Sequence, residues 1–119
     1  MRLLTSEQEK QLLANGAANA SCIARDQEPE DFRPVVKLFC PWGAATWLLT
    51  ELDPNDPDIA FGLCDLGMGF PEIGSVSLAE LSSIGGPGGL RIERDLYFTP
   101  SSTLQGYAEE ARHAGRIVA

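Results

Sequence analysis

The sequence predicts an α+β fold: one domain built on a mostly antiparallel sheet, with helices from both ends of the chain packed on it. In the middle of the chain, short apolar runs alternate with Gly, Pro, Asn and Asp clusters, which is typical of strands joined by tight connections. Helix-capping patterns occur near residues 5 and 77. The chain has 119 residues, which suffices for one domain that folds without disulfides.

The first predicted helix begins at residues 5–9, where two overlapping capping boxes pair Thr5 with Gln8 and Ser6 with Glu9. We expect this helix to end near Ala14, because the Asn-Gly pair at 15–16 is typical of a helix C-terminus. Residues 17–33 then form a connector that becomes acidic, and it is long for a compact domain. We therefore expect this connector to be mobile or partly helical.

A hairpin over about residues 45–66 forms the centre of the predicted sheet. Its strands are expected at 45–52 and 59–66, and the intervening Asp-Pro-Asn-Asp-Pro-Asp has the composition of a hairpin loop. Pairing residue 52 with residue 59 gives one face with Leu48, Thr50, Phe61 and Leu63, and another with Trp47, Leu49, Gly62 and Cys64. Both faces are largely apolar, so we expect the hairpin to be covered on each side.

Other elements are expected on both sides of this hairpin. Further strands are predicted at residues 35–39, 73–76 and 90–98. A short helix capped by Ser77 should run to about Ile84, and a last helix should run from about Thr103 to Ala114, with Gly115 ending it. The predicted organisation is a single globular domain over 1–119.

The charge balance restricts the partners. Asp and Glu number 17 against 9 Lys and Arg, so the net charge is −8. Naked nucleic acid should be repelled, and basic proteins are the favoured partners. No apolar run approaches the length of a membrane span, and the first residues lack the apolar core of a signal peptide. The three widely spaced cysteines fit free thiols, so we expect a cytoplasmic protein without membrane contact.

The candidate functional residues are carboxylates along the hairpin and the turn after it. No Lys, Arg or His interrupts this series, which comprises Glu51, Asp53, Asp56, Asp58, Asp65 and Glu72. Packed carboxylates must be solvated, bind a cation or face a basic partner. Trp42, between Pro41 and Gly43, is a candidate interface anchor if exposed; its alternative is core packing at the sheet edge.

Enzymatic alternatives rest on weaker patterns. Loop oxygens at residues 53–58 could bind Mg²⁺ or Ca²⁺, but the spacing is not that of an EF-hand. The one histidine, His113, lies near the end of a predicted helix, where it is better suited to stabilise the helix C-terminus than to take part in catalysis. A solvated turn or an acidic edge that binds a partner explains the cluster better. We therefore predict no catalytic residue, no metal site and no cofactor.

Several segments together resemble a family of small bacterial proteins known only as a domain of unknown function. They are Leu3-Leu4-Thr5, residues 34–39, 47–53 and 58–67, Pro71-Glu72-Ile73-Gly74, residues 77–81, and Glu93-Arg94-Asp95. Such genes are typical of plasmids, conjugative and integrative elements and phage-derived islands, and their neighbours include antirestriction-type genes. The resemblance therefore implies an accessory role in the biology of mobile DNA, and it implies no catalytic residue.

The leading hypothesis is a non-enzymatic acidic protein that inhibits or modulates a host defence complex that handles nucleic acid, as antirestriction and anti-CRISPR proteins do. Its carboxylates would occupy a basic surface that otherwise meets phosphates, without direct contact with nucleic acid. Two alternatives are a small metal-assisted hydrolase that uses the same carboxylates, and a structural subunit of a conjugation complex.

Overall fold

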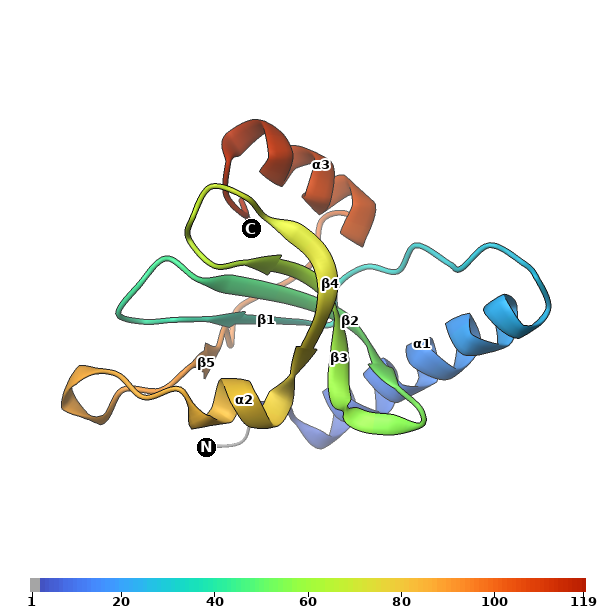
Figure 1. Ribbon diagram of the computed structural model, residues 1–119, viewed down its shortest axis with the longest axis horizontal. Coiled ribbons are helices and arrows are strands. Elements are labelled where there is room, and N and C mark those ends of the chain that lie inside the picture. The colour runs from blue at the N-terminus through green and yellow to red at the C-terminus, as the bar shows by residue number, and fades with distance from the viewer. Residues whose placement is uncertain (1–2) are drawn as a thin grey trace.

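The computed structural model describes residues 3–119 and confirms the α+β class. Five strands form one antiparallel sheet in the order β4-β3-β2-β1-β5, with helices packed on it (Figure 1). Over the described residues, no helix combines the length and apolarity that crossing a membrane requires. The elements are α1 Ser6–Ala24, β1 Val36–Phe39, β2 Thr46–Asp53, β3 Asp56–Asp65, β4 Glu72–Ser77, α2 Leu78–Ser83, the 3-10 turn Pro87–Gly89, β5 Glu93–Arg94 and α3 Leu104–Ala114.

The hairpin β2–β3 lies at the centre of the sheet, and its turn is tighter than predicted. Asp53 pairs directly with Asp56, so only residues 54–55 form the turn. The predicted register holds from Thr46 to Leu49, where Leu48 pairs with Leu63. A bulge at Thr50 then shifts the pairing by one residue, so that Leu52 pairs with Ala60 and not with Ile59.

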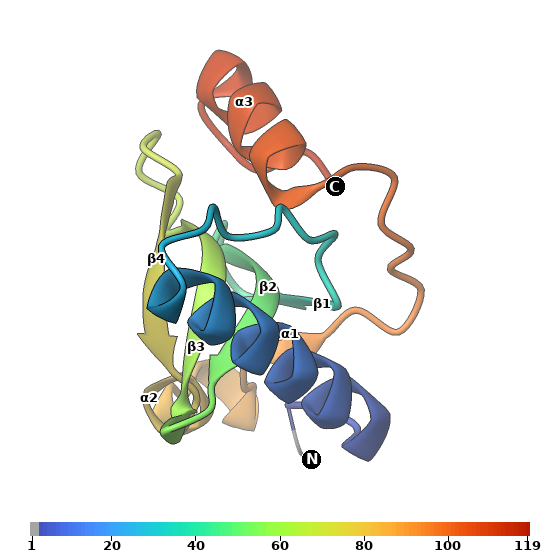
Figure 2. The same cartoon turned by 90° about the vertical axis from the view of Figure 1, so that its right-hand side faces the viewer.

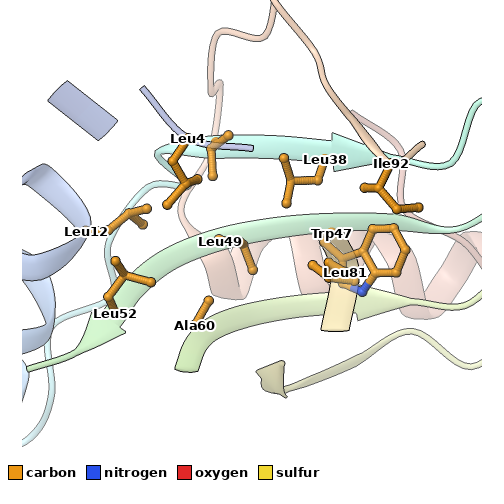
Figure 3. Close-up of a cluster of buried hydrophobic side chains, with 10 residues drawn as sticks. Leu4, Leu12, Leu38, Trp47, Leu49, Leu52, Ala60, Leu81 and Ile92 are labelled. Atoms are coloured by element: carbon orange, nitrogen blue, oxygen red, sulfur yellow. The ribbon is translucent and has the colours of Figure 1, made fainter. Parts of the chain in front are cut away.

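Both faces of the hairpin are covered in the half far from its turn, as predicted, but the face under α3 is left open nearer the turn, at Ile59 and Phe61. The larger apolar cluster lies on the face that includes Trp47 and Leu49, and Figure 3 shows its side chains meeting over β1 and β2. Its buried members are Leu4, Leu12, Val36, Leu38, Trp47, Leu49, Leu52, Ala60, Leu81 and Ile92. The second cluster, on the opposite face, joins Leu48 and Leu63 to Leu104, Tyr107, Ala108 and Ala111 of α3 and to Ile117 after it. Burial on two faces explains why the hairpin strands are almost continuously apolar.

Helix α1 continues ten residues beyond its predicted end at Ala14, and Asn15 and Gly16 lie in its interior. β1 covers the edge of β2 only as far as Leu49, whose carbonyl accepts from the Val35 amide at 2.8 Å. Beyond that point α1 lies along β2. The Asn15 side-chain amide donates to the Thr50 carbonyl at 2.9 Å, and Gly16 lies against the Leu52 carbonyl. The Asn-Gly pair therefore marks a helix–sheet contact and not a helix end.

The predicted connector at 17–33 is correspondingly helical up to Ala24. The segment that follows α1 then runs between α1 and α3 before it enters β1 (Figures 1 and 2). The polar side chain of Asn19 and the backbone of Glu30 hold its middle, as described below.

The predicted strand at 90–98 is wrong in length. Only Glu93–Arg94 pairs with β1, and an isolated bridge joins Gly85 to Arg91. The strand stops because the Asp95 carboxylate accepts from the Tyr97 amide at 2.9 Å, which turns the chain away from the sheet. An alternating pattern alone does not supply the partner strand that a longer β5 would need.

Replacing Gly16 with Ala should destabilise the protein by about 2–4 kcal/mol. An added Cβ would lie 1.8 Å from the Leu52 carbonyl oxygen, so helix and strand would have to separate. Helix propensity alone predicts the opposite sign, a gain of about 1 kcal/mol. Urea unfolding followed by circular dichroism measures the difference. Gly74→Ala is the matched control, since no atom of the described residues lies within 4 Å of its added Cβ. Equal stability of the two variants would contradict the contact.

Candidate functional site

The six carboxylates predicted as one acidic face are distributed along the whole hairpin. Asp53 and Asp56 flank the turn at one end, and Asp65 and Glu72 lie at the other. The ten residues of β3 span about 30 Å, so the two groups cannot meet one small ligand. The structure therefore does not bring the predicted set together, and each member has its own environment.

Asp65 has a structural role. Its side chain is only 2% exposed, and its two oxygens accept from the amides of Gly67 at 2.8 Å and Ile117 at 2.9 Å. The first bond shapes the turn after β3, and the second ties the segment after α3 to the sheet. Hydrogen bonds from backbone amides satisfy this buried carboxylate, so it needs no external cation.

Asp58 has a similar role at the start of α2. It accepts from the Ser77 hydroxyl at 2.6 Å and from the Ala79 amide at 2.8 Å. These two hydrogen bonds, the Ser77 bond first, hold the pKa of Asp58 below its usual range. Asp58 thus joins β3 to the junction between β4 and α2.

Trp42 packs at the end of the sheet. Its ring lies against Gly86, where an added Cβ would come within 2.4 Å of it, and its half-buried side chain joins the larger apolar cluster. This is the core-packing alternative for Trp42. Of the remaining predicted residues, Asp56 and Glu72 are exposed at opposite ends of the hairpin. Glu51 and Asp53 lie in a groove beside α1.

This groove exists because α3 covers only part of its face of the sheet. α3 packs on Leu48 and Leu63, and beyond them Ile59 and Phe61 of β3 are left uncovered by it. Two adjoining hollows of about 320 and 430 Å³ lie there, and both include Asn19, Pro29, Glu51 and Phe61 in their walls. We call them together the acidic groove, lined by α1, the segment after it, the half of the β2–β3 hairpin that carries its turn, and the N-terminus of α3.

The walls of the acidic groove combine apolar and acidic side chains. Its carboxylates are Glu28, Glu30, Asp31, Glu51 and Asp53, and no Lys, Arg or His among residues 3–119 lines either hollow. Its apolar members include Ala20, Ile23, Pro29, Ile59 and Phe61. Ile23 is 66% exposed on the last turn of α1. Apolar side chains left in water beside unneutralised carboxylates are typical of a binding surface.

Asn19 organises this groove. It is 4% exposed, and its amide nitrogen donates to the Glu51 Oε2 at 2.8 Å and to the Glu30 carbonyl at 3.1 Å. Its oxygen accepts from the Glu30 amide at 2.8 Å. One buried side chain therefore holds both the acidic segment and the Glu51 carboxylate in place.

Glu51 is the most unusual carboxylate of the groove. It is half-buried, and burial raises its pKa, an effect that the Asn19 hydrogen bond offsets only in part. Its Oε1 accepts no hydrogen bond from the described residues, in contrast to both oxygens of Asp65. A carboxylate kept partly desolvated and incompletely bonded gains from an added cationic partner.

Sequence reasoning found Glu51 and Asp53 but missed the rest of the groove. The acidic run at 26–31 and the two asparagines of α1 were the available signals. Their meaning depended on α1 continuing past Gly16, which places Asn19 beside Glu51. Among residues 3–119, no three His, Cys, Asp or Glu side chains are arranged to hold a metal ion.

Fold and groove define the chain as an acidic α+β domain with a five-stranded antiparallel sheet and an open groove beside its first helix. The chain belongs to the family described as protein of unknown function (DUF2958), whose model matches residues 3–118. No curated protein and no solved structure matches the chain.

Replacing Asp65 with Asn should cost about 1–3 kcal/mol of unfolding free energy, since the new NH₂ would face a backbone amide that needs an acceptor. Thermal or urea unfolding measures the loss. Asp53→Asn makes the same change at an exposed turn, where Asn also accepts from a backbone amide. It should change stability by less than about 0.5 kcal/mol; a larger loss there than at Asp65 would contradict the assignment.

Replacing Glu51 with Gln should raise stability at neutral pH. Because burial raises the pKa of Glu51, the folded chain keeps this proton to a higher pH than the unfolded chain. The contribution of protonated Glu51 to the free energy of unfolding is complete below the ordinary pKa of 4.5. It is lost as the pH rises through the raised pKa of the folded chain. The gain in the variant should be less than about 1 kcal/mol, because the carboxyl is only half-buried.

Melting temperatures of the two proteins from about pH 4 to about pH 8 test this, because the gap should close as the pH falls towards the ordinary carboxyl range. Glu109→Gln, on the exposed side of α3, controls for the change in net charge. A gap that is independent of pH would show that ionisation of Glu51 is not its cause.

Proposed function

We propose that this protein acts without catalysis by binding a basic surface of another protein through its acidic groove. The observation that carries the proposal is the composition of the groove, in which five carboxylates surround apolar side chains and the described part of the chain contributes no basic residue to the lining. The net charge of −8 adds a long-range attraction for basic partners. The apolar floor supplies the burial that a charged rim alone does not.

The target class we propose is a host defence complex that handles nucleic acid, as in antirestriction or anti-CRISPR inhibition. Such complexes hold a phosphate backbone with Lys and Arg side chains, which are the groups that the groove carboxylates would meet. The segments that resemble proteins of plasmids and integrative elements support this class. An inhibitor of this kind competes with nucleic acid for the same basic residues and needs no contact with nucleic acid itself.

Capture of the target should depend on salt and on the groove. We expect the tagged protein to retain a nucleic-acid-handling complex from a host lysate at low salt, and affinity for the purified complex to fall about tenfold between low and high salt. The double variant Glu51→Gln/Asp53→Asn should lose the capture, because it removes two groove charges. Quantitative mass spectrometry of the retained proteins is the measurement.

The matched control is Glu109→Gln/Glu110→Gln, which removes the same charge from the exposed side of α3. It should capture the complex as well as the unchanged protein does. Equal losses in both double variants would mean that overall charge, and not the groove, attracts the partner. Capture that is insensitive to salt would overturn the proposal.

A further inference from the structure

We propose that the acidic groove recognises an arginine side chain of its partner, with the guanidinium held by the Glu51 carboxylate and stacked on the Phe61 ring. This inference rests on the proposed function, because it specifies which basic group the groove accepts. It assigns a specificity-determining pair of residues to a surface that otherwise offers only charge and apolar area.

The geometry of the hairpin places the two side chains together. Glu51 and Phe61 are direct cross-strand partners, the first pair beyond the bulge at Thr50. Directly opposed residues in an antiparallel pair have Cβ atoms about 5 Å apart. Both side chains line both hollows of the groove, and Phe61 keeps 36% of its surface exposed. A ligand in the groove therefore meets an aromatic ring and a carboxylate at once.

This pair fits a guanidinium better than an ammonium. A guanidinium is planar, it donates two parallel hydrogen bonds to one carboxylate, and it stacks on an aromatic face. A lysine ammonium is a compact and strongly hydrated charge that gains less from the ring. The partial burial of Glu51 strengthens the preference, since a weakly hydrated cation is easier to bring into a desolvated site.

The carboxylate is held ready for such a ligand. Asn19 engages Oε2 of Glu51, and Asn19 is itself fixed by two bonds to the Glu30 backbone. The side chain therefore loses little freedom when a partner arrives, which favours affinity. The apolar residues Ile23 and Ile59 would pack against neighbours of the arginine, so the preferred ligand is an arginine flanked by apolar residues.

Calorimetric titration with two short peptides tests the inference. In one peptide arginine alternates with leucine, and in the other lysine replaces arginine at unchanged net charge. We expect the arginine peptide to bind about tenfold more tightly. Phe61→Leu should remove this preference while leaving salt-dependent binding of both peptides. Phe70→Leu is the matched control, because Phe70 is 79% exposed in the loop between β3 and β4 and should leave the preference unchanged.

The outcomes separate this inference from the proposed function. Equal affinity for the two peptides, or a preference that survives Phe61→Leu, overturns arginine recognition while basic-protein capture through the groove still stands. Loss of the preference in Phe70→Leu would place arginine recognition at the loop between β3 and β4, and would also overturn recognition by Glu51 and Phe61. Failure of both peptides to bind, together with no salt-sensitive capture from lysate, overturns both proposals. Circular dichroism of each variant confirms that it is folded.

Discussion

The close approach of α1 to the open edge of β2 is the constraint on which the rest of the structure depends. β1 is too short to pair with the second half of β2, and an uncovered strand edge in the middle of a sheet leaves carbonyl groups without partners. α1 covers this edge because Gly16 has no side chain and because Asn15 donates to the Thr50 carbonyl. Because a helix, and not another strand, lies beside this part of β2, an open space remains between α1 and α3. The acidic groove lies in that space.

The polar side chains of α1 extend this constraint to the candidate site. Gln11, Asn15 and Asn19 are spaced by four residues, so they share one face of the helix. Gln11 donates to Asn15 at 2.8 Å, Asn15 bonds the β2 backbone, and Asn19 bonds Glu51 one residue further along β2. The same contact that closes the sheet edge therefore orients the groove carboxylate. A shorter α1 that ended at Ala14 would provide neither.

The sequence predicted the elements that depend on local chemistry. Of the two overlapping capping boxes predicted at residues 5–9, the one at Thr5 forms. The cap Ser77, the central hairpin and the final Gly115 are where the pattern placed them. It failed where a distant contact decides. An Asn-Gly pair is a common helix end, and only the Leu52 carbonyl shows why this one is not. The bulge at Thr50 and the short β5 likewise depend on partner strands that no local window contains. For the site, Glu51 and Asp53 were predictable as acidic residues, but the groove was not.

The distribution of hydrogen-bond donors separates the structural carboxylates from the functional candidates. Asp58 and Asp65 each accept two hydrogen bonds from nearby groups of the fold, so both carboxylates are already satisfied within the protein. Among the described residues, only Asn19 donates a hydrogen bond to the Glu51 side chain, which is also partly desolvated; both are unfavourable for the free protein. A residue kept at some cost to stability is better explained by a ligand than by folding, because folding alone would favour a neutral side chain there. Counting acidic residues along the sequence treats the three alike; the contacts distinguish them and concentrate the binding hypothesis on Glu51.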